Sequence, residues 1–204
     1  MRRSTAKIYT KIIILIVLLS ALLVSISLLN FENGVNKIKT NFIFTKNVEK
    51  YRPLVEKFAI ENNVEDHVET LLAMMMQESG GRGNDPMQSS ESLCGKVGCI
   101  EDPEQSIEQG VAYFAKALDL ADGEVELAVQ AYNFGLGFIH YVEKNNTNYS
   151  EEIAIQFSQE MYKNADDPSI YTCLRKGTKE LEACYGDIYY VRDVMGYKKT
   201  LAVK

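Results

Sequence analysis

One glutamate occupies a position where a polar side chain is unexpected. Glu78 lies seven residues after Leu71 and fourteen after Val64 in an apolar stripe, so it falls within about 40° of both around a helix. Burial disfavours its charged form, and so does the negative end of the helix dipole, because a Gly-Gly pair ends the helix just beyond it. A carboxylic acid that keeps its proton near neutral pH can act as a general acid, as cleavage of a glycosidic bond requires. The alternative is a glutamate that rotates into solvent or pairs with Arg82.

Three short motifs are arranged around this glutamate in the chain. They are Gln77-Glu78-Ser79-Gly80-Gly81 at the helix end, Met87-Gln88 in the following loop, and Ala131-Tyr132-Asn133-Phe134-Gly135 on a later apolar helix. In this order they resemble the signatures of the lysozyme-like superfamily, which includes soluble lytic transglycosylases and goose-type lysozymes. Residues 47–145 are most similar to the CwlT-like lysozyme domain of Gram-positive cell-wall hydrolases, in particular through Asp85-Pro86-Met87-Gln88-Ser89-Ser90-Glu91-Ser92.

The resemblance implies an activity and a set of site residues. It implies cleavage of the β-1,4 bond between N-acetylmuramic acid and N-acetylglucosamine in the glycan strands of peptidoglycan, with Glu78 as the catalytic acid. The glycan groove around this acid is expected to contain Ser79, Met87, Gln88, Tyr132 and Asn133. The chain departs from the pattern in two main respects. The connection from Glu78 to Met87 is shorter than in most lytic transglycosylases, and Asp85-Pro86 stands where they usually carry Gly-Leu. A milder departure is Phe134, which replaces a small residue after Tyr132-Asn133.

The fate of the cleaved sugar depends on a second carboxylate. A hydrolase needs one to hold a water or to act as nucleophile, whereas in a lytic transglycosylase one glutamate serves as acid and then as base. Asp85 is the candidate for a second catalytic carboxylate, although Asp-Pro also commonly begins a turn. We favour muramidase-type hydrolysis and keep transglycosylation, which leaves 1,6-anhydromuramoyl ends, as the alternative. A non-catalytic surface protein that binds glycan or a partner is the rival of another class, but binding does not require Glu78.

The elements that position these residues are predicted to be helices. Apolar residues recur at helical spacing through most of the chain, without a sustained alternating pattern. The fold class is therefore all-α, with a single lysozyme-like helical domain. Helices are expected around residues 51–61, 64–79, 103–121, 125–132, 138–142, 151–163 and 187–195, with a long loop over residues 82–105.

The first 46 residues differ in composition from the rest of the chain. Residues 1–11 are basic, residues 12–31 form an apolar run about 30 Å long as a helix, and residues 32–46 show no periodicity. We interpret them as a cytoplasmic segment, a transmembrane anchor and a linker to the catalytic domain over residues 47–204. The excess of Lys and Arg before the run predicts a single-pass protein of the cell membrane, with its domain extracellular. A cleavable signal peptide is the alternative.

The cysteines fit an exported domain, because all four follow the apolar run. Their even number predicts two disulfides. Of the three possible pairings, Cys94–Cys99 and Cys173–Cys184 close the shortest loops and cost the least chain entropy. A zinc site built from all four is the alternative, although neither pair has the spacing usual for structural zinc.

The charge of the chain argues against one class of partner. The first thirty residues hold four basic residues and no acid, which leaves 18 basic against 28 acidic residues in the remainder. Nucleic-acid phosphates require a basic face, so DNA and RNA are not expected partners. His67 and His140 are isolated from other metal-binding residues in the sequence, and we expect neither a metal centre nor a cofactor.

Overall fold

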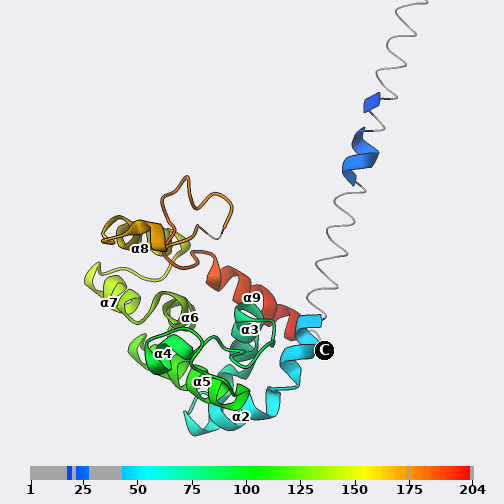
Figure 1. Cartoon of the computed structure of the whole chain (residues 1–204), viewed down its shortest axis with the longest axis vertical. Coiled ribbons are helices and arrows are strands. Elements are labelled where there is room, and N and C mark those ends of the chain that lie inside the picture. Colours follow the sequence, from blue (N-terminus) through cyan, green and yellow to red (C-terminus); the bar gives the residue numbers. More distant parts are fainter. Residues whose placement is uncertain (1–17, 20–21, 28–42, 174, 203–204) are drawn as a thin grey trace, which may run out of the picture. The chain divides into compact units, whose positions relative to one another are not determined.

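The computed structural model describes residues 18–19, 22–27, 43–173 and 175–202 (Figure 1). The chain divides between Ile43 and Phe44 into two units, which we describe separately. In the first unit, residues 18–19 and 22–27 are helical, and their leucine, valine and isoleucine side chains are exposed. Most of the predicted anchor over residues 12–31 lies outside the described residues. Among those described, no helix has both the length and the apolar character that a membrane span requires.

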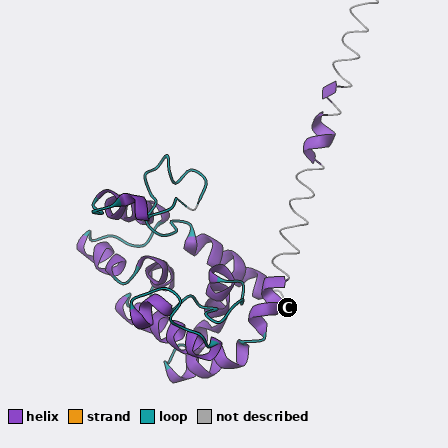
Figure 2. Cartoon of the chain, in the orientation of Figure 1, coloured by secondary structure: helices purple, strands orange, loops and turns teal. Residues whose placement is uncertain are grey.

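The regular elements described in the second unit are all helices (Figure 2). Residues 44–49 form the first of them. The others, in chain order, are α2 (Arg52–Glu61), η1 (Glu65–His67), α3 (Val68–Glu78), α4 (Ser90–Cys94), α5 (Pro103–Leu120), α6 (Val125–Phe134), α7 (Gly137–Lys144), α8 (Glu151–Lys163), η2 (Pro168–Ile170) and α9 (Tyr190–Leu201).

Helix α3 lies in the centre of the hydrophobic core. Seven consecutive residues, from Thr70 to Met76, are buried, so this helix is covered on all sides over two turns. It packs most extensively on α9, and Figure 1 shows these two helices next to each other. Helix α5 packs on α2 and on α6. The end of α6 meets the loop that follows α3, because the Tyr132 hydroxyl donates to the carbonyl of Met87.

Local sequence signals define where several helices begin. The side chain of Asp102 accepts a hydrogen bond from the backbone N–H of Glu104, and Pro103 occupies the first turn of α5. Ser150 caps α8 in the same way, by accepting from the N–H of Ile153. These caps satisfy backbone donors that have no partner within the helix.

The predicted all-helical architecture is confirmed, with three corrections. Residues 82–105 are not one continuous loop, because they contain α4. The predicted linker over residues 32–46 ends in helix, since residues 43–49 are helical. The last helix begins at Tyr190 and ends at Leu201, later than the predicted 187–195.

The preferred disulfide pairing is confirmed. Cys94 is bonded to Cys99 and Cys173 to Cys184, and no described cysteine is free. The alternative of a four-cysteine zinc site is wrong for this structure, because zinc binds thiolates and all four sulfurs are in disulfides.

Candidate active site

Glu78 is the last residue of α3 and is partly buried. Its Oε1 accepts a hydrogen bond from the hydroxyl of Tyr190, at 2.6 Å. Burial raises the pKa of Glu78 from 4.5 to about 7, while the Tyr190 hydrogen bond acts in the opposite direction. The negative charges of Asp187 and Asp85 add to the rise. The raised pKa therefore has the predicted direction, and burial, one of the two predicted causes, makes the largest contribution.

A pocket of about 220 Å³ opens at this carboxyl group. Its walls come from the end of α3, from the loop and α4 that follow it, and from the end of α6. The lining residues are Glu78, Asp85, Gln88, Ser90, Glu91, Val97, Tyr132 and Asn133. Five of the seven residues predicted for catalysis or glycan binding therefore meet at one cavity.

A second pocket of about 310 Å³ continues from the first. The two share Gln88, Glu91, Tyr132 and Asn133 as lining residues, and the second adds the aromatic rings of Tyr113, Phe134 and Tyr185. Together they form a groove with hydrogen-bonding groups near Glu78 and aromatic surface farther away. Sugars bind to such surfaces through hydroxyl hydrogen bonds and through stacking of their apolar faces.

Asp85 holds the loop between α3 and α4 in shape. Its Oδ1 accepts from the N–H of Ser89 at 2.9 Å and from the hydroxyl of Ser106 at 2.6 Å. Its Oδ2 accepts from the N–H of Ser90 at 3.1 Å and from the Ser90 hydroxyl at 2.6 Å. Burial opposes ionisation, but these hydrogen bonds outweigh it and lower the pKa of Asp85. The backbone carbonyl of Asp85 also accepts from the N–H of Gln88, so the alternative of an Asp-Pro turn is observed.

Two predicted groove residues do not line the pocket. Met87 is fully buried, and its backbone N–H donates to the Ser106 hydroxyl at 3.0 Å. The hydroxyl of Ser79 donates to the carbonyl of Pro86 at 2.8 Å. Both residues therefore fix the loop that carries Asp85 and Gln88, in contrast to the direct glycan contact that was predicted.

Tyr132 and Asn133 lie in the last turn of α6 and line both pockets. The Tyr132 hydroxyl donates to the carbonyl of Met87 at 2.8 Å, which connects α6 to the loop. Burial raises the pKa of Tyr132 well above its ordinary range, so the hydroxyl stays neutral and a donor. The side-chain oxygen of Asn133 accepts from the N–H of Asp187 at 2.7 Å, so donation from its NH₂ group is the chemistry that it can offer a ligand.

A glycine allows α5 to approach this group of residues. A Cβ atom on Gly110 would lie 2.7 Å from Cβ of Met87 and 2.9 Å from the hydroxyl oxygen of Tyr132. Such distances are shorter than van der Waals contact, so only glycine fits without moving the loop or α6.

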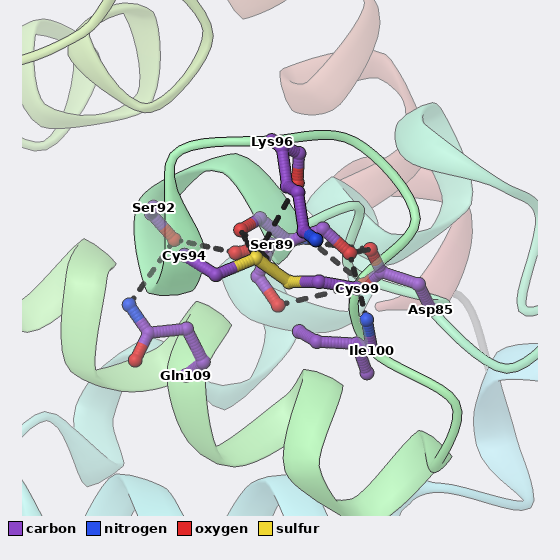
Figure 3. Close-up of a disulfide and its surroundings, with 9 residues drawn as sticks. Asp85, Ser89, Ser92, Cys94, Lys96, Cys99, Ile100 and Gln109 are labelled. Carbon is purple, nitrogen blue, oxygen red and sulfur yellow. Dashed lines mark hydrogen bonds between the residues drawn. A yellow bond between two sulfur atoms is a disulfide. The ribbon is translucent and has the colours of Figure 1, made fainter.

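The Cys94–Cys99 disulfide closes the segment that forms one rim of the pocket (Figure 3). Within this segment Val97 is 76% exposed and lines the pocket. The N–H of Ile100 donates to the Ser90 hydroxyl at 3.3 Å, and the Gln109 amide donates to the Ser92 hydroxyl at 3.1 Å. The second of these bonds connects α4, which leads into the rim, to α5, as Figure 3 shows.

The C-terminal segment supplies site residues that the sequence did not reveal. Tyr190 is 112 residues from Glu78 in the chain, and Asp187 is 109 residues from it. In the sequence, Tyr185, Tyr189 and Tyr190 were recognisable only as aromatic side chains that could stack on sugars or pack in the core. No spacing rule relates Tyr190 to Glu78 in the sequence. The two residues meet because α9 packs on α3.

No cluster of three or more His, Cys, Asp or Glu side chains in the described part of the chain is arranged to hold a metal ion. The groups that the two pockets offer to a ligand are carboxyl, amide, hydroxyl and aromatic side chains.

A family model described as Lysozyme-like matches residues 45–198. The chain belongs to this lysozyme-like family. It is 43% identical over 152 residues to the bifunctional muramidase/DL-endopeptidase CwlT of Bacillus subtilis, covering 74% of this chain and 42% of that protein. It is also 38% identical over 128 residues to a pneumococcal vaccine antigen A homolog of Streptococcus pyogenes, covering 60% of this chain and 64% of the relative.

Two further comparisons concern the membrane and the fold. YocA of Bacillus subtilis, which is described as an uncharacterized membrane protein, is 36% identical over 173 residues, or 80% of this chain and 74% of the relative. A crystal structure of a Staphylococcus aureus protein, described as similar to a lipoprotein of the NLP/P60 family, matches with a TM-score of 0.64 and 37% identity. That match covers 74% of this chain and 52% of the staphylococcal chain. The lysozyme-like chain thus spans about half or less of two of these relatives.

Proposed function

We propose that this lysozyme-like protein cleaves the glycan strands of peptidoglycan. The bond is the β-1,4 linkage between N-acetylmuramic acid and N-acetylglucosamine, and Glu78 is the general acid. The observation that carries the proposal is a carboxyl group with a pKa near 7 at a groove lined by amide, hydroxyl and aromatic groups. The family, and a relative whose name includes muramidase activity, support it.

In this proposal the two oxygens of Glu78 have separate roles. Because Oε1 accepts from Tyr190, the proton of the neutral acid resides on Oε2, from which it passes to the glycosidic oxygen. The bond from the anomeric carbon to that oxygen then breaks, and positive charge develops on the sugar ring. Tyr190 continues to donate to Oε1 and stabilises the carboxylate that remains. Asp85, which is held ionised by its serine donors, supplies negative charge near the developing cation.

The second step determines the product, and we favour hydrolysis with Asp85 as the second carboxylate. Water then attacks the anomeric carbon, gives a proton to the Glu78 carboxylate, which restores the acid, and leaves a reducing end. The engagement of both Asp85 oxygens by Ser89, Ser90 and Ser106 favours a role as a fixed charge over a role as nucleophile. Because Asp85 is held in this way, transglycosylation is the second candidate, since that reaction needs only Glu78, first as acid and then as base.

The deciding experiment uses purified cell walls and the Glu78→Gln variant. The wild type is expected to release muropeptides, and the variant to lose turnover by at least about 10²-fold while keeping its fold. Glu108→Gln, an exposed position on α5, is the matched control and should keep full activity. Mass analysis identifies the chemistry, because a reducing end means hydrolysis and an anhydro end means transglycosylation. If the wild type binds walls but releases nothing, the protein is a glycan-binding surface protein and the enzymatic proposal is wrong.

We further propose that residues 12–31 anchor the protein in the cell membrane, with the N-terminus cytoplasmic and the domain outside. The length of the apolar run and the basic residues before it support this topology. One relative is described as a membrane protein. Accessibility of Cys94 and Cys99 to an impermeant thiol reagent after reduction of intact cells would test it, because these cysteines are not buried and labelling requires an extracellular domain.

A further inference from the structure

Asp187 is a buried carboxylate that connects several parts of the site. It is 6% exposed, and its Oδ1 accepts from the backbone N–H of Tyr189 at 3.0 Å. The Gln77 amide donates to its Oδ2 at 3.4 Å. Its own backbone N–H donates to Asn133, and its backbone carbonyl accepts from Gln130 at 3.0 Å. One residue therefore contacts α3, α6 and the beginning of α9.

Three of the residues that Asp187 contacts lie beside the acid, in its pocket or on its hydrogen bond. Gln77 precedes Glu78 on α3, and Asn133 lines the pocket. Tyr190, the first residue of α9, donates its backbone N–H to the carbonyl of Asp187 and its hydroxyl to Glu78. Asp187 itself lines neither pocket, so it has no route to substrate contact in this structure.

The charge of Asp187 is balanced by one arginine. Nε of Arg175 donates to both oxygens of Asp187, at 3.1 and 3.0 Å, and its NH2 group donates to Oδ2. The same NH2 group also lies 2.7 Å from Asp193 on α9. A bidentate guanidinium fixes both the charge and the orientation of a carboxylate, whereas an unpaired buried carboxylate is costly. The Cys173–Cys184 disulfide closes the segment in which Arg175 lies.

We propose that Arg175 and Asp187 are positioning residues for the catalytic acid. The ion pair holds Asp187 in the orientation that places the hydroxyl of Tyr190 on Glu78 and the amide of Asn133 at the pocket. This inference rests on the proposed role of Glu78. It further implies that activity depends on Arg175 and Asp187, which line neither pocket, as well as on the residues of the groove.

The expected effects depend on all the groups around Glu78. Asp85 faces it from the loop, Tyr132 from α6, and Tyr190 and Asp187 from the C-terminal segment. Loss of Arg175 leaves the negative charge of Asp187 unbalanced and should raise the pKa of Glu78. Replacement of Asp187 by Asn removes that charge and should lower it.

The test compares Arg175→Gln, Arg175→Lys and Asp187→Asn with the matched control Arg52→Gln. Arg52 is also a partly exposed arginine in an ion pair, with Glu69 on α3, but lies on α2. On soluble glycan fragments, Arg175→Gln and Asp187→Asn should lower kcat by about 10- to 100-fold with little change in KM. Arg175→Lys should recover part of the loss, because it keeps the charge, and Arg52→Gln should keep the wild-type kcat.

A second readout does not depend on activity. With ¹³C-labelled glutamate, NMR titration of the Glu78 carboxyl should show a midpoint above the wild type in Arg175→Gln and below it in Asp187→Asn. If Arg175→Gln does not fold, the Arg175→Gln/Asp187→Asn double variant leaves no unbalanced charge, and its midpoint should also fall. The inference is overturned if the Arg175 and Arg52 variants lose thermal stability equally and change neither kcat nor the midpoint. A wild type that cleaves nothing defeats the proposed function, and the titration then still decides whether this pair sets the state of Glu78.

Discussion

The hydroxyl of Tyr190 donates a 2.6 Å hydrogen bond to Oε1 of Glu78, and this bond joins the first residue of α9 to the last residue of α3. Burial and the neighbouring carboxylates favour the protonated form of Glu78, whereas this bond favours the ionised form. These opposing effects place the pKa of Glu78 at about 7, where the carboxyl group can donate its proton and then remain as a carboxylate. Changes to the groups around Glu78 should therefore shift both its ionisation and the activity.

Removal of the Tyr190 hydroxyl should shift the balance toward the protonated acid. In Tyr190→Phe the ring stays packed, but Glu78 loses a donor, so its pKa should rise and the alkaline limb of the pH–rate profile should move to higher pH. The same loss should lower kcat, because the carboxylate left by proton transfer is less stable, and should cost about 1–3 kcal/mol of stability. Tyr189→Phe is the control, since its hydroxyl has no proposed role at Glu78. An unchanged alkaline limb would contradict the assignment of this bond.

Glu78 should destabilise the folded protein at high pH. Its folded pKa of about 7 lies above the ordinary 4.5, so its contribution to stability is fully present below 4.5 and is lost as the pH rises through about 7. Glu78→Gln is neutral at every pH. It should therefore be more stable than the wild type at about pH 9, by up to about 3 kcal/mol, with partial exposure making this an upper bound. Urea denaturation as a function of pH measures the difference. A difference that is independent of pH would show that Glu78 is not perturbed.

Asp85 should show the opposite pH dependence. Its folded pKa is lowered, so its stabilising contribution is present above the ordinary value of 3.8 and is lost as the pH falls through the folded pKa. Asp85→Asn leaves one acceptor oxygen where two accept now, and should cost about 2 kcal/mol near neutral pH but much less in acid. Thermal melts at the two pH values check this. If the variant retains stability but loses all turnover, Asp85 acts in the chemistry and not through the loop.

Gly110 should tolerate no larger side chain. Gly110→Ala places a Cβ atom against Met87 and Tyr132, and should cost about 1–3 kcal/mol and reduce activity through the displaced loop. Gly196→Ala is the matched control on α9, because a Cβ atom there would meet nothing within 4 Å apart from its chain neighbours and the backbone of its own helix. Alanine at that position should stabilise the helix by up to about 1 kcal/mol. Calorimetry of both variants measures these opposite signs, and a stabilised Gly110→Ala would contradict the packing described above.

Most of the helical fold was predictable because each helix carries its own signal. Helix α5, for example, has apolar residues at steps of three and four and a Pro at its first turn, and both signals are local. Helix α4 was not predictable in this way. It has five residues, and it begins where Asp85 accepts from the N–H groups of Ser89 and Ser90, a contact that apolar periodicity does not reveal.

The candidate site also contains residues that local sequence signals predict and residues that only the folded structure reveals. Glu78 was predictable because a carboxylate on an apolar stripe is locally anomalous, and the motifs around Gln88 and Asn133 were recognisable by their order. The roles of Met87 and Ser79 were not, because a motif residue can support a groove from behind as well as line it. The positions of Tyr190 and Asp187 beside the site depend on the packing of α9 against α3. A single sequence does not reveal this contact.

Titration of the Glu78 carboxyl by ¹³C NMR in the wild-type protein tests the central claim most directly. Glu78→Gln identifies its resonance, since that signal disappears in the variant. A midpoint about 7 would establish a group that stays protonated until near neutral pH and then ionises, as the proposed acid must. A midpoint near 4.5, the value of a solvated glutamate, would mean that Glu78 is already ionised where the enzyme should work, and the proposed role of this carboxyl group would be wrong.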